Sequence, residues 1–229
     1  MALSTTEIEI YNAGERLIPG VTHDDAETVR HRSSYRFFRL IIERDARADR
    51  VKPPIRILDF GCGVGHGTAM LAEIPGAFVV GSDVSLACIL YARAHYPRPN
   101  AEYRLVSPDY AFEMPDYDYV VSRGVIEHIP DGLTVAVNTR WTNRLLFNVP
   151  YNEPPGNTHH LLLGITERDF AGFPTAELYF EGLDGTTYDA GSKPPAPNMI
   201  TCICSGPELP PVSEFDLAFP LPAWPHPCA

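Results

Sequence analysis

Short apolar runs alternate with amphipathic segments through the middle of the chain. Five of these runs predict strands: IRILDF, AFVVGSD, AEYRLV, YDYVVS and RLLFNVP. Helices are predicted between them over residues 66–73, in SLACILYARAHY, and over residues 131–140. Strands that alternate with helices in this way form a parallel, doubly wound α/β sheet, whose ligands lie beyond the carboxyl ends of the strands. Functional residues are therefore expected just after each strand.

The two ends of the chain have patterns of their own. A helix is predicted from Asp24 or Asp25 to residue 49, and after Pro150 the runs AELYFEGL and NMITCICS predict an antiparallel pair at the sheet edge. Seven prolines after Ser205 exclude a helix or central strand there, although the segment is too apolar for a solvated tail. We expect an N-terminal helical cap over 1–54, the α/β domain over 55–204, and a proline-rich tail over 205–229 that lies extended across the body.

Charge and cysteine content narrow the function classes. The 229 residues carry 18 Lys and Arg against 29 Asp and Glu, a net charge of −11, so a nucleic-acid-binding surface is not expected. Neither a secretory signal nor a membrane-spanning run is visible, which predicts a cytoplasmic protein. The five cysteines are an odd number without zinc-site spacing, so reduced thiols are expected.

The strongest local signal is the turn Asp59-Phe60-Gly61-Cys62-Gly63-Val64-Gly65-His66-Gly67 after the first predicted strand. Alternate glycines let the backbone turn tightly and approach a ligand closely. A phosphate-binding P-loop would need a lysine before Thr68, and Gly67 stands there. A dinucleotide fingerprint would need its third glycine at position 66, which is a histidine.

The remaining form, Asp-x-Gly-x-Gly-x-Gly, resembles motif I of class I S-adenosylmethionine-dependent methyltransferases. The resemblance implies a Rossmann-like, mostly parallel seven-stranded sheet with an antiparallel last strand and helices on both faces. It places S-adenosylmethionine in the 55–204 domain, its methionine part at the glycine turn, its ribose hydroxyls on Asp83 after the second strand, and its adenine near Asp109. The implied cofactor-binding residues are Asp59, Gly61, Cys62, Gly63, Asp83, Val84, Asp109 and Arg123.

The fourth predicted strand, followed by Val125-Ile126-Glu127-His128-Ile129-Pro130-Asp131, resembles the ubiquinone-biosynthesis-like branch of that family. Members of this branch methylate oxygen on small molecules and on lipid or sugar acceptors. The segment Gly14-Glu15-Arg16, with His31 and Tyr35, is similar to an N-terminal segment of glycan-associated members, and the overall pattern is similar to mycobacterial methylmannose polysaccharide O-methyltransferases. A small-molecule or oligosaccharide acceptor, mannoside-like, is therefore expected, with Tyr11, Tyr35, Tyr151 and Trp224 as candidates for a sugar site.

A hydroxyl acceptor benefits from a base that takes its proton, and histidine has a suitable pKa. His128 and Glu127 are candidates for catalysis or for a scaffold role, and His159 and His160 form a second candidate set, of which we expect only one to be catalytic. Some relatives use Mg²⁺, for which Glu127 and Asp131 are candidate ligands, with the two loop histidines as further donors. A metal-free site is the equal alternative.

Three other functions stay open from the residues alone. They are an N- or carboxyl-methyltransferase of a small metabolite, a non-catalytic S-adenosylmethionine-binding protein, and a nicotinamide oxidoreductase. The sequence Asn148-Val149-Pro150-Tyr151 resembles a signature of amino-group DNA methyltransferases, but it follows the fifth strand instead of the fourth, which favours a strand end that turns into a loop. Whether the chain forms a homodimer is left open as well.

Overall fold

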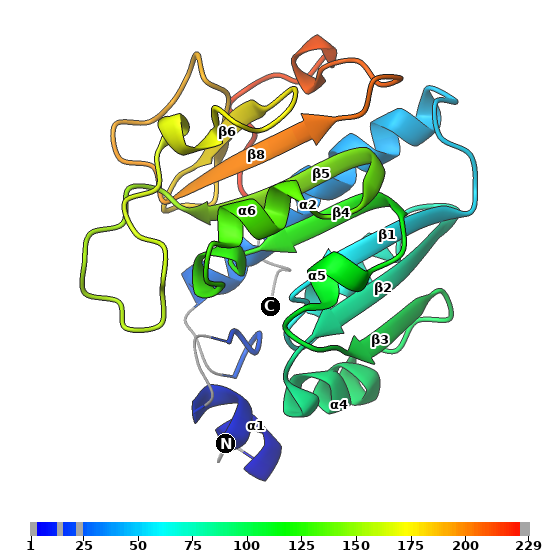
Figure 1. Ribbon diagram of the computed structural model, residues 1–229, viewed down its shortest axis with the longest axis vertical. Helices are drawn as coiled ribbons and strands as arrows, with labels where there is room; N and C mark the ends of the chain where they lie inside the picture. Colours follow the sequence, from blue (N-terminus) through cyan, green and yellow to red (C-terminus); the bar gives the residue numbers. More distant parts are fainter. Residues whose placement is uncertain (1–3, 13–15, 22–24, 225–229) are drawn as a thin grey trace.

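The computed structural model describes residues 4–12, 16–21 and 25–224, and its centre is one eight-stranded sheet with helices on both faces (Figure 1). The strand order is β3-β2-β1-β4-β5-β8-β6-β7. The first five strands run parallel, and β8 lies antiparallel between β5 and β6. The strands are β1 (Ile55–Phe60), β2 (Ala77–Asp83), β3 (Ala101–Leu105), β4 (Tyr117–Arg123), β5 (Trp141–Pro150), β6 (Glu177–Glu181), β7 (Thr187–Tyr188) and β8 (Met199–Ser205).

This architecture confirms the predicted Rossmann-like class I fold and its antiparallel last strand, with one correction. The sheet has eight strands instead of seven, because the two-residue strand β7 pairs with β6 through Thr187 and Tyr188. A two-residue strand leaves no apolar alternation in the sequence from which it could be predicted. The predicted antiparallel pair, β6 and β8, is present, with β8 in the interior of the sheet and fully buried along its length.

The helices are α1 (Thr5–Asn12), α2 (Asp25–Arg47), α3 (His66–Leu71), α4 (Leu86–His95), α5 (Tyr110–Glu113) and α6 (Gly132–Val137), with 3₁₀ turns η1 (Ile126–His128), η2 (Glu167–Phe170) and η3 (Val212–Glu214). Helices α1 and α5 were not expected, since each is short. Ser85 caps α4 by accepting a hydrogen bond from the Cys88 amide at 3.3 Å. Asp24, the other candidate start of the second helix, lies outside the described residues, as do Gly14, Glu15 and Cys228.

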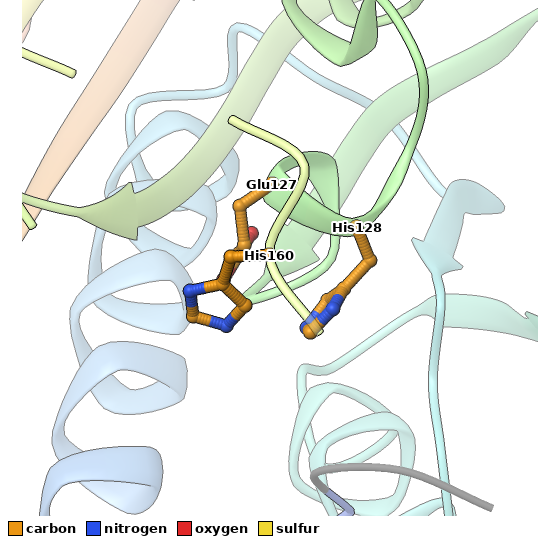
Figure 2. A group of neighbouring side chains, drawn as sticks. All are labelled: Glu127, His128 and His160. Atoms are coloured by element: carbon orange, nitrogen blue, oxygen red, sulfur yellow. The ribbon is translucent and has the colours of Figure 1, made fainter. Parts of the chain in front are cut away.

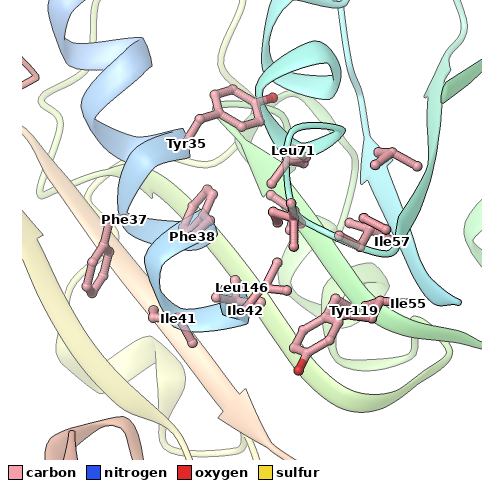
Figure 3. Close-up of a cluster of buried hydrophobic side chains, with 14 of the residues drawn as sticks. Tyr35, Phe37, Phe38, Ile41, Ile42, Ile55, Ile57, Leu71, Tyr119 and Leu146 are labelled. Carbon is pink, nitrogen blue, oxygen red and sulfur yellow. The ribbon is translucent and has the colours of Figure 1, made fainter. Parts of the chain in front are cut away.

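Successive strand residues point to two separate cores, one on each face of the sheet. Ile57 and Val79 join the core under α2 and α3, to which Phe38 and Ile41 contribute (Figure 3). Leu58 and its neighbours on the sheet join the opposite core, under α5, α6 and η2. Burial of each such side chain stabilises the fold by about 1.5–3 kcal/mol. The parallel strands are thus apolar on both faces, which is why each appears in the sequence as a continuous run of apolar residues.

A buried ion pair joins α2 to β5 on the first of these faces. The Arg144 guanidinium donates from Nε and Nη2 to the two carboxylate oxygens of Asp45 at 2.8 and 3.0 Å, and both side chains are fully buried. The Tyr119 hydroxyl donates to the same carboxylate at 3.0 Å, and Arg144 also donates to the carbonyl of Pro210 at 2.9 Å. The pair therefore fixes the long helix, two strands and the start of the proline-rich segment relative to one another.

The proline-rich segment lies extended against α2 and the edge of the sheet. Leu221 exchanges two backbone hydrogen bonds with Thr187 of β7, at 2.8 and 2.9 Å. The Phe219 ring contacts Phe37 of α2 and Tyr179 of β6, with centroids 6.2 and 5.4 Å apart. In the part of the chain that the structure describes, no helix combines the length and the apolar character that a membrane span requires.

Candidate functional site

A cavity of 490 Å³ opens at the carboxyl ends of β1, β2 and β4, within the range of small-molecule sites. Its walls come from the glycine turn after β1, from the ends of β2 and β4, and from α2 and the N-terminal segment. Ser107 and Pro108, after β3, and His159, in the loop after β5, complete it. The cavity therefore occupies the position that a parallel α/β sheet provides for ligands.

The glycine turn forms the floor of this cavity because three of its residues adopt left-handed backbone angles. Gly61, Gly63 and Gly65 have φ of 76°, 51° and 89°. A Cβ on Gly61 would lie 2.4 Å from a methyl group of Val125, so that position has no room for a side chain. At Gly63 a Cβ would meet no protein atom within 4 Å, because the residue borders the cavity, and it would instead project into the ligand's space.

Asp83, at the end of β2, places a carboxylate on the cavity wall. Its Oδ2 accepts a hydrogen bond from the Gly63 amide at 2.9 Å, and its Oδ1 accepts one from the Ser85 amide at 2.8 Å. Each carboxylate oxygen has two lone pairs, so one acceptor position on each remains for a ligand hydroxyl. A diol such as a ribose fits this carboxylate, and Arg16 lies 4.0 Å from its Oδ1. Val84 and Cys62 also line the cavity.

Asp59 lies beneath the glycine turn and does not line the cavity. The fully buried carboxylate accepts hydrogen bonds from the Tyr35 hydroxyl at 2.9 Å and from Thr68 Oγ1 at 2.5 Å. Burial raises its pKa to about 6, although these two hydrogen bonds act in the opposite direction. A Cβ at Gly67 would lie 2.0 Å from the Tyr35 ring, so the glycine lets α2 approach the turn. Asp59 thus acts on the cavity through the shape of the turn.

Asp109 and Asp131, the other two predicted acidic residues, also lie off the cavity wall. Asp109 is exposed at the start of α5, and its neighbours Ser107 and Pro108 line the cavity instead. Asp131 is exposed before α6, with a left-handed φ of 51°. Of the aromatic candidates, Tyr35 lines the cavity, whereas Tyr11, Tyr151 and Trp224 do not.

A group of charged and aromatic side chains forms the wall toward α2. The guanidinium of Arg123, the last residue of β4, lies 2.5 Å from His31 Nε2 and 3.4 Å from a carboxylate oxygen of Glu27. Burial alone would raise the pKa of Glu27, but the hydrogen bond with His31 and the charge of Arg123 hold it well below its usual range. His66 begins α3 as expected, and burial lowers its pKa, so its ring is neutral. The contribution of Glu27 has no signal in the sequence, because it depends on how α2 packs against β4.

Glu127, His128 and His160 converge where η1 meets the loop after β5 (Figure 2). One donor atom from each of them lies within 4.8 Å of the others. The amides of Leu161 and Leu162 donate to the Glu127 carbonyl at 2.8 and 3.1 Å, which holds the loop after β5 against η1. His128 lines the cavity, whereas Glu127 is buried behind it.

The two histidine rings of this cluster are oriented by hydrogen bonds on their Nδ1 atoms. His128 Nδ1 lies 2.9 Å from the backbone carbonyl of His159, and His160 Nδ1 contacts a carboxylate oxygen of Glu153. Carbonyl and carboxylate oxygens only accept, so each ring donates from Nδ1 and, when neutral, carries its lone pair on Nε2. Burial raises the pKa of Glu127 to about 7, and the nearby charge of His160 opposes this shift. His159 itself lines the cavity.

The comparisons with known proteins point to methyltransferases. Residues 57–145 match the model of a family described as a methyltransferase domain. Ubiquinone biosynthesis O-methyltransferase from Ruegeria sp. (strain TM1040) is 33% identical over 101 residues, which cover 43% of this chain and 40% of that protein. Phosphoethanolamine N-methyltransferase 2 from Caenorhabditis elegans is 37% identical over 84 residues, or 35% of this chain and 19% of that protein. The matched segment thus spans less than half the length of either relative.

Among solved structures, magnesium protoporphyrin IX methyltransferase from Synechocystis PCC 6803 with bound SAH shares the fold. Its TM-score is 0.57 at 17% sequence identity, over 88% of this chain and 95% of that one. All three of these proteins are methyltransferases, and none is a nicotinamide oxidoreductase. The family match includes β1, β2 and β4, the strands whose carboxyl ends border the cavity.

Proposed function

We propose that this chain, which carries a class I S-adenosylmethionine-dependent methyltransferase domain, transfers a methyl group from that cofactor to a hydroxyl oxygen of a small acceptor. The observation that carries the proposal is a single cavity lined both by the glycine turn and Asp83 and by His128 and His159. We assign the first set to the cofactor end and the second set to the acceptor end. In-line displacement needs donor and acceptor in one space, held in line.

The cofactor end is assigned to the turn and the strand ends. When bound, S-adenosylmethionine supplies an electrophilic methyl group on a sulfonium centre. Gly63 leaves space for its methionine part against the backbone, Gly61 lets the turn pack against Val125, and the Asp83 carboxylate accepts hydrogen bonds from its ribose hydroxyls. We assign cofactor contacts also to Cys62, Val84 and Arg123, which line the cavity, and an indirect role to Asp59 through Tyr35 and Thr68.

The acceptor end is assigned to the imidazoles that line the cavity beyond the turn. As the acceptor oxygen bonds to the methyl carbon, its proton must leave, and an imidazole within reach takes it. We assign this role to His128 and His159, which line the cavity, and a supporting role to Glu127 and His160, which lie close to His128. A saccharide hydroxyl is the acceptor we propose first, on the sequence resemblance of Arg16, His31 and Tyr35, all of which line this cavity.

An amine acceptor is the second candidate, because one of the relatives named above is a phosphoethanolamine N-methyltransferase. The two are separated by incubation of the purified chain with S-adenosylmethionine and a panel of mannosides, phenols and amino alcohols, with release of S-adenosylhomocysteine as the readout. Turnover with hydroxyl acceptors alone supports the proposal. Turnover with amines alone would replace it, and Asp83→Ala should lower either activity about 10- to 100-fold at subsaturating cofactor.

A further inference from the structure

The cluster of Glu127, His128 and His160 has the donor set of a metal site. Its three donor atoms come from η1 and from the loop after β5, and they lie within 4.8 Å of one another. A point central to three atoms so spaced is about 2.8 Å or less from each, so movements of about 0.7 Å would give the 2.0–2.1 Å bonds of a divalent transition ion. Side-chain rotations supply movements of that size without any change of the backbone.

Both histidine rings make the type of hydrogen bond that metal-bound histidines make. A ligating histidine almost always donates its other ring N–H to a carboxylate or a backbone carbonyl, which fixes the ring and its tautomer. His128 does so to the carbonyl of His159, and His160 does so to the carboxylate of Glu153. When neutral, both rings therefore carry on Nε2 the lone pair that a metal ligand offers.

The carboxylate supplies the second independent observation. Glu127 is only 2% exposed, and its Oε2 has no hydrogen-bond partner among the described residues. A buried carboxylate oxygen without a partner is costly, at about 1–3 kcal/mol or more when charged. A cation bound beside it would remove that cost, and the neighbouring imidazoles complete the same coordination sphere.

We propose that Glu127, His128 and His160 bind a divalent transition ion of the zinc type at the acceptor end of the cavity. Two imidazoles and one carboxylate are the three protein ligands of one class of catalytic zinc site, in which water or substrate takes the fourth position. Mg²⁺ prefers oxygen ligands, and Asp131, the other ligand predicted for it, lies outside the cluster, so we propose a transition ion here instead of Mg²⁺. His128 lines the cavity, so an ion bound to it can lower the pKa of an acceptor hydroxyl there.

The catalytic role of the ion rests on the proposed function, but the test of ion binding does not. Because a ligating His128 cannot also take a proton, the ion leaves proton uptake to His159. The test uses the full chain stripped with chelator and titrated with Co²⁺, with its visible absorption as the readout, and with Zn²⁺ as competitor. One Co²⁺ per chain is expected, displaced by Zn²⁺ and not by Mg²⁺ at the same concentration.

Single substitutions test which side chains bind the ion. His128→Ala, His160→Ala and Glu127→Gln should each remove Co²⁺ binding, and Glu153→Gln should weaken it about 10- to 100-fold by releasing the His160 ring. His159→Ala is the matched control: its backbone carbonyl still orients His128, so Co²⁺ binding should stay unchanged. Absent Co²⁺ binding, or binding that survives His160→Ala, would overturn the proposal. A parallel titration with S-adenosylhomocysteine shows whether each variant is folded and separates this failure from that of the proposed function.

Discussion

Substitution of Glu181 tests how much a buried, ionised carboxylate costs in folding stability. The side chain lies at the end of β6, is 2% exposed, and accepts a hydrogen bond from Ser34 Oγ at 2.6 Å. Asn148 Nδ2 donates to the same hydroxyl at 3.1 Å, so a hydrogen-bonded chain runs from β5 through α2 to β6. The second oxygen, Oε1, has no partner within the described ranges. Replacement by glutamine keeps the shape and the accepted hydrogen bond but removes the ionisation.

The size of the expected stability difference follows from the pKa of Glu181. Burial raises the pKa of Glu181 from 4.5 to about 7, and the charge of Arg123 opposes the shift. The folded state therefore binds the proton more tightly than the unfolded state, so stability falls as pH rises between about 4.5 and 7. A shift of about 2.5 pKa units corresponds to about 3 kcal/mol. Glu181→Gln does not bear this cost, so relative to wild type it should gain about 3 kcal/mol between pH 4.5 and pH 8.

Urea unfolding of both proteins at pH 5, 6, 7 and 8 measures this difference. Asp59 and Glu127 also have raised pKa values, but they titrate in both proteins and cancel in the comparison. Glu208→Gln, at an exposed position of the proline-rich segment, is the control for removal of one carboxylate from the surface. A constant difference between Glu181→Gln and wild type across this range would refute the assigned burial cost.

Three further variants test other parts of the structure. Asp83→Ala removes the carboxylate on the cavity wall and should raise the Kd for S-adenosylhomocysteine about 10- to 100-fold by calorimetry; an unchanged Kd would contradict its role. Asp45→Ala leaves Arg144 buried without its partner and should cost about 3–5 kcal/mol of stability in urea unfolding, whereas a loss below 1 kcal/mol would show that the pair is solvated. Phe219→Ala should lower stability by about 1–3 kcal/mol and speed proteolysis of the proline-rich segment, and equal cleavage rates would show that its packing is unimportant.

The parts of the fold that the sequence predicts are those with a local cause. The five parallel strands are continuous apolar runs, and the glycine turn is dictated by left-handed angles at Gly61, Gly63 and Gly65. The position of Asp59 illustrates the limit. It precedes the glycines in sequence, but the approach of Tyr35 over Gly67 buries it beneath the turn, and that approach depends on the packing of α2.

The candidate site also combines residues that the sequence predicts with contacts that only the packing determines. Glu127 and His128 follow the fourth strand, so the sequence predicts them at the carboxyl ends of the parallel strands. Their convergence with His160 depends on the amides of Leu161 and Leu162, which hold a long loop on the Glu127 carbonyl. No local pattern encodes that contact, so the sequence could not predict that His160 joins this cluster while His159 and Asp131 lie outside it, or that Glu153 contacts the His160 ring.

The central claim is that the cavity binds S-adenosylmethionine, and its product is the most direct probe. A calorimetric titration of the purified chain with S-adenosylhomocysteine, with NADH in a parallel cell, measures this without knowledge of the acceptor. We predict one site with a micromolar Kd for S-adenosylhomocysteine and no heat with NADH. Absence of binding, or equal binding of NADH, would contradict the assignment of the glycine turn and Asp83 to this cofactor.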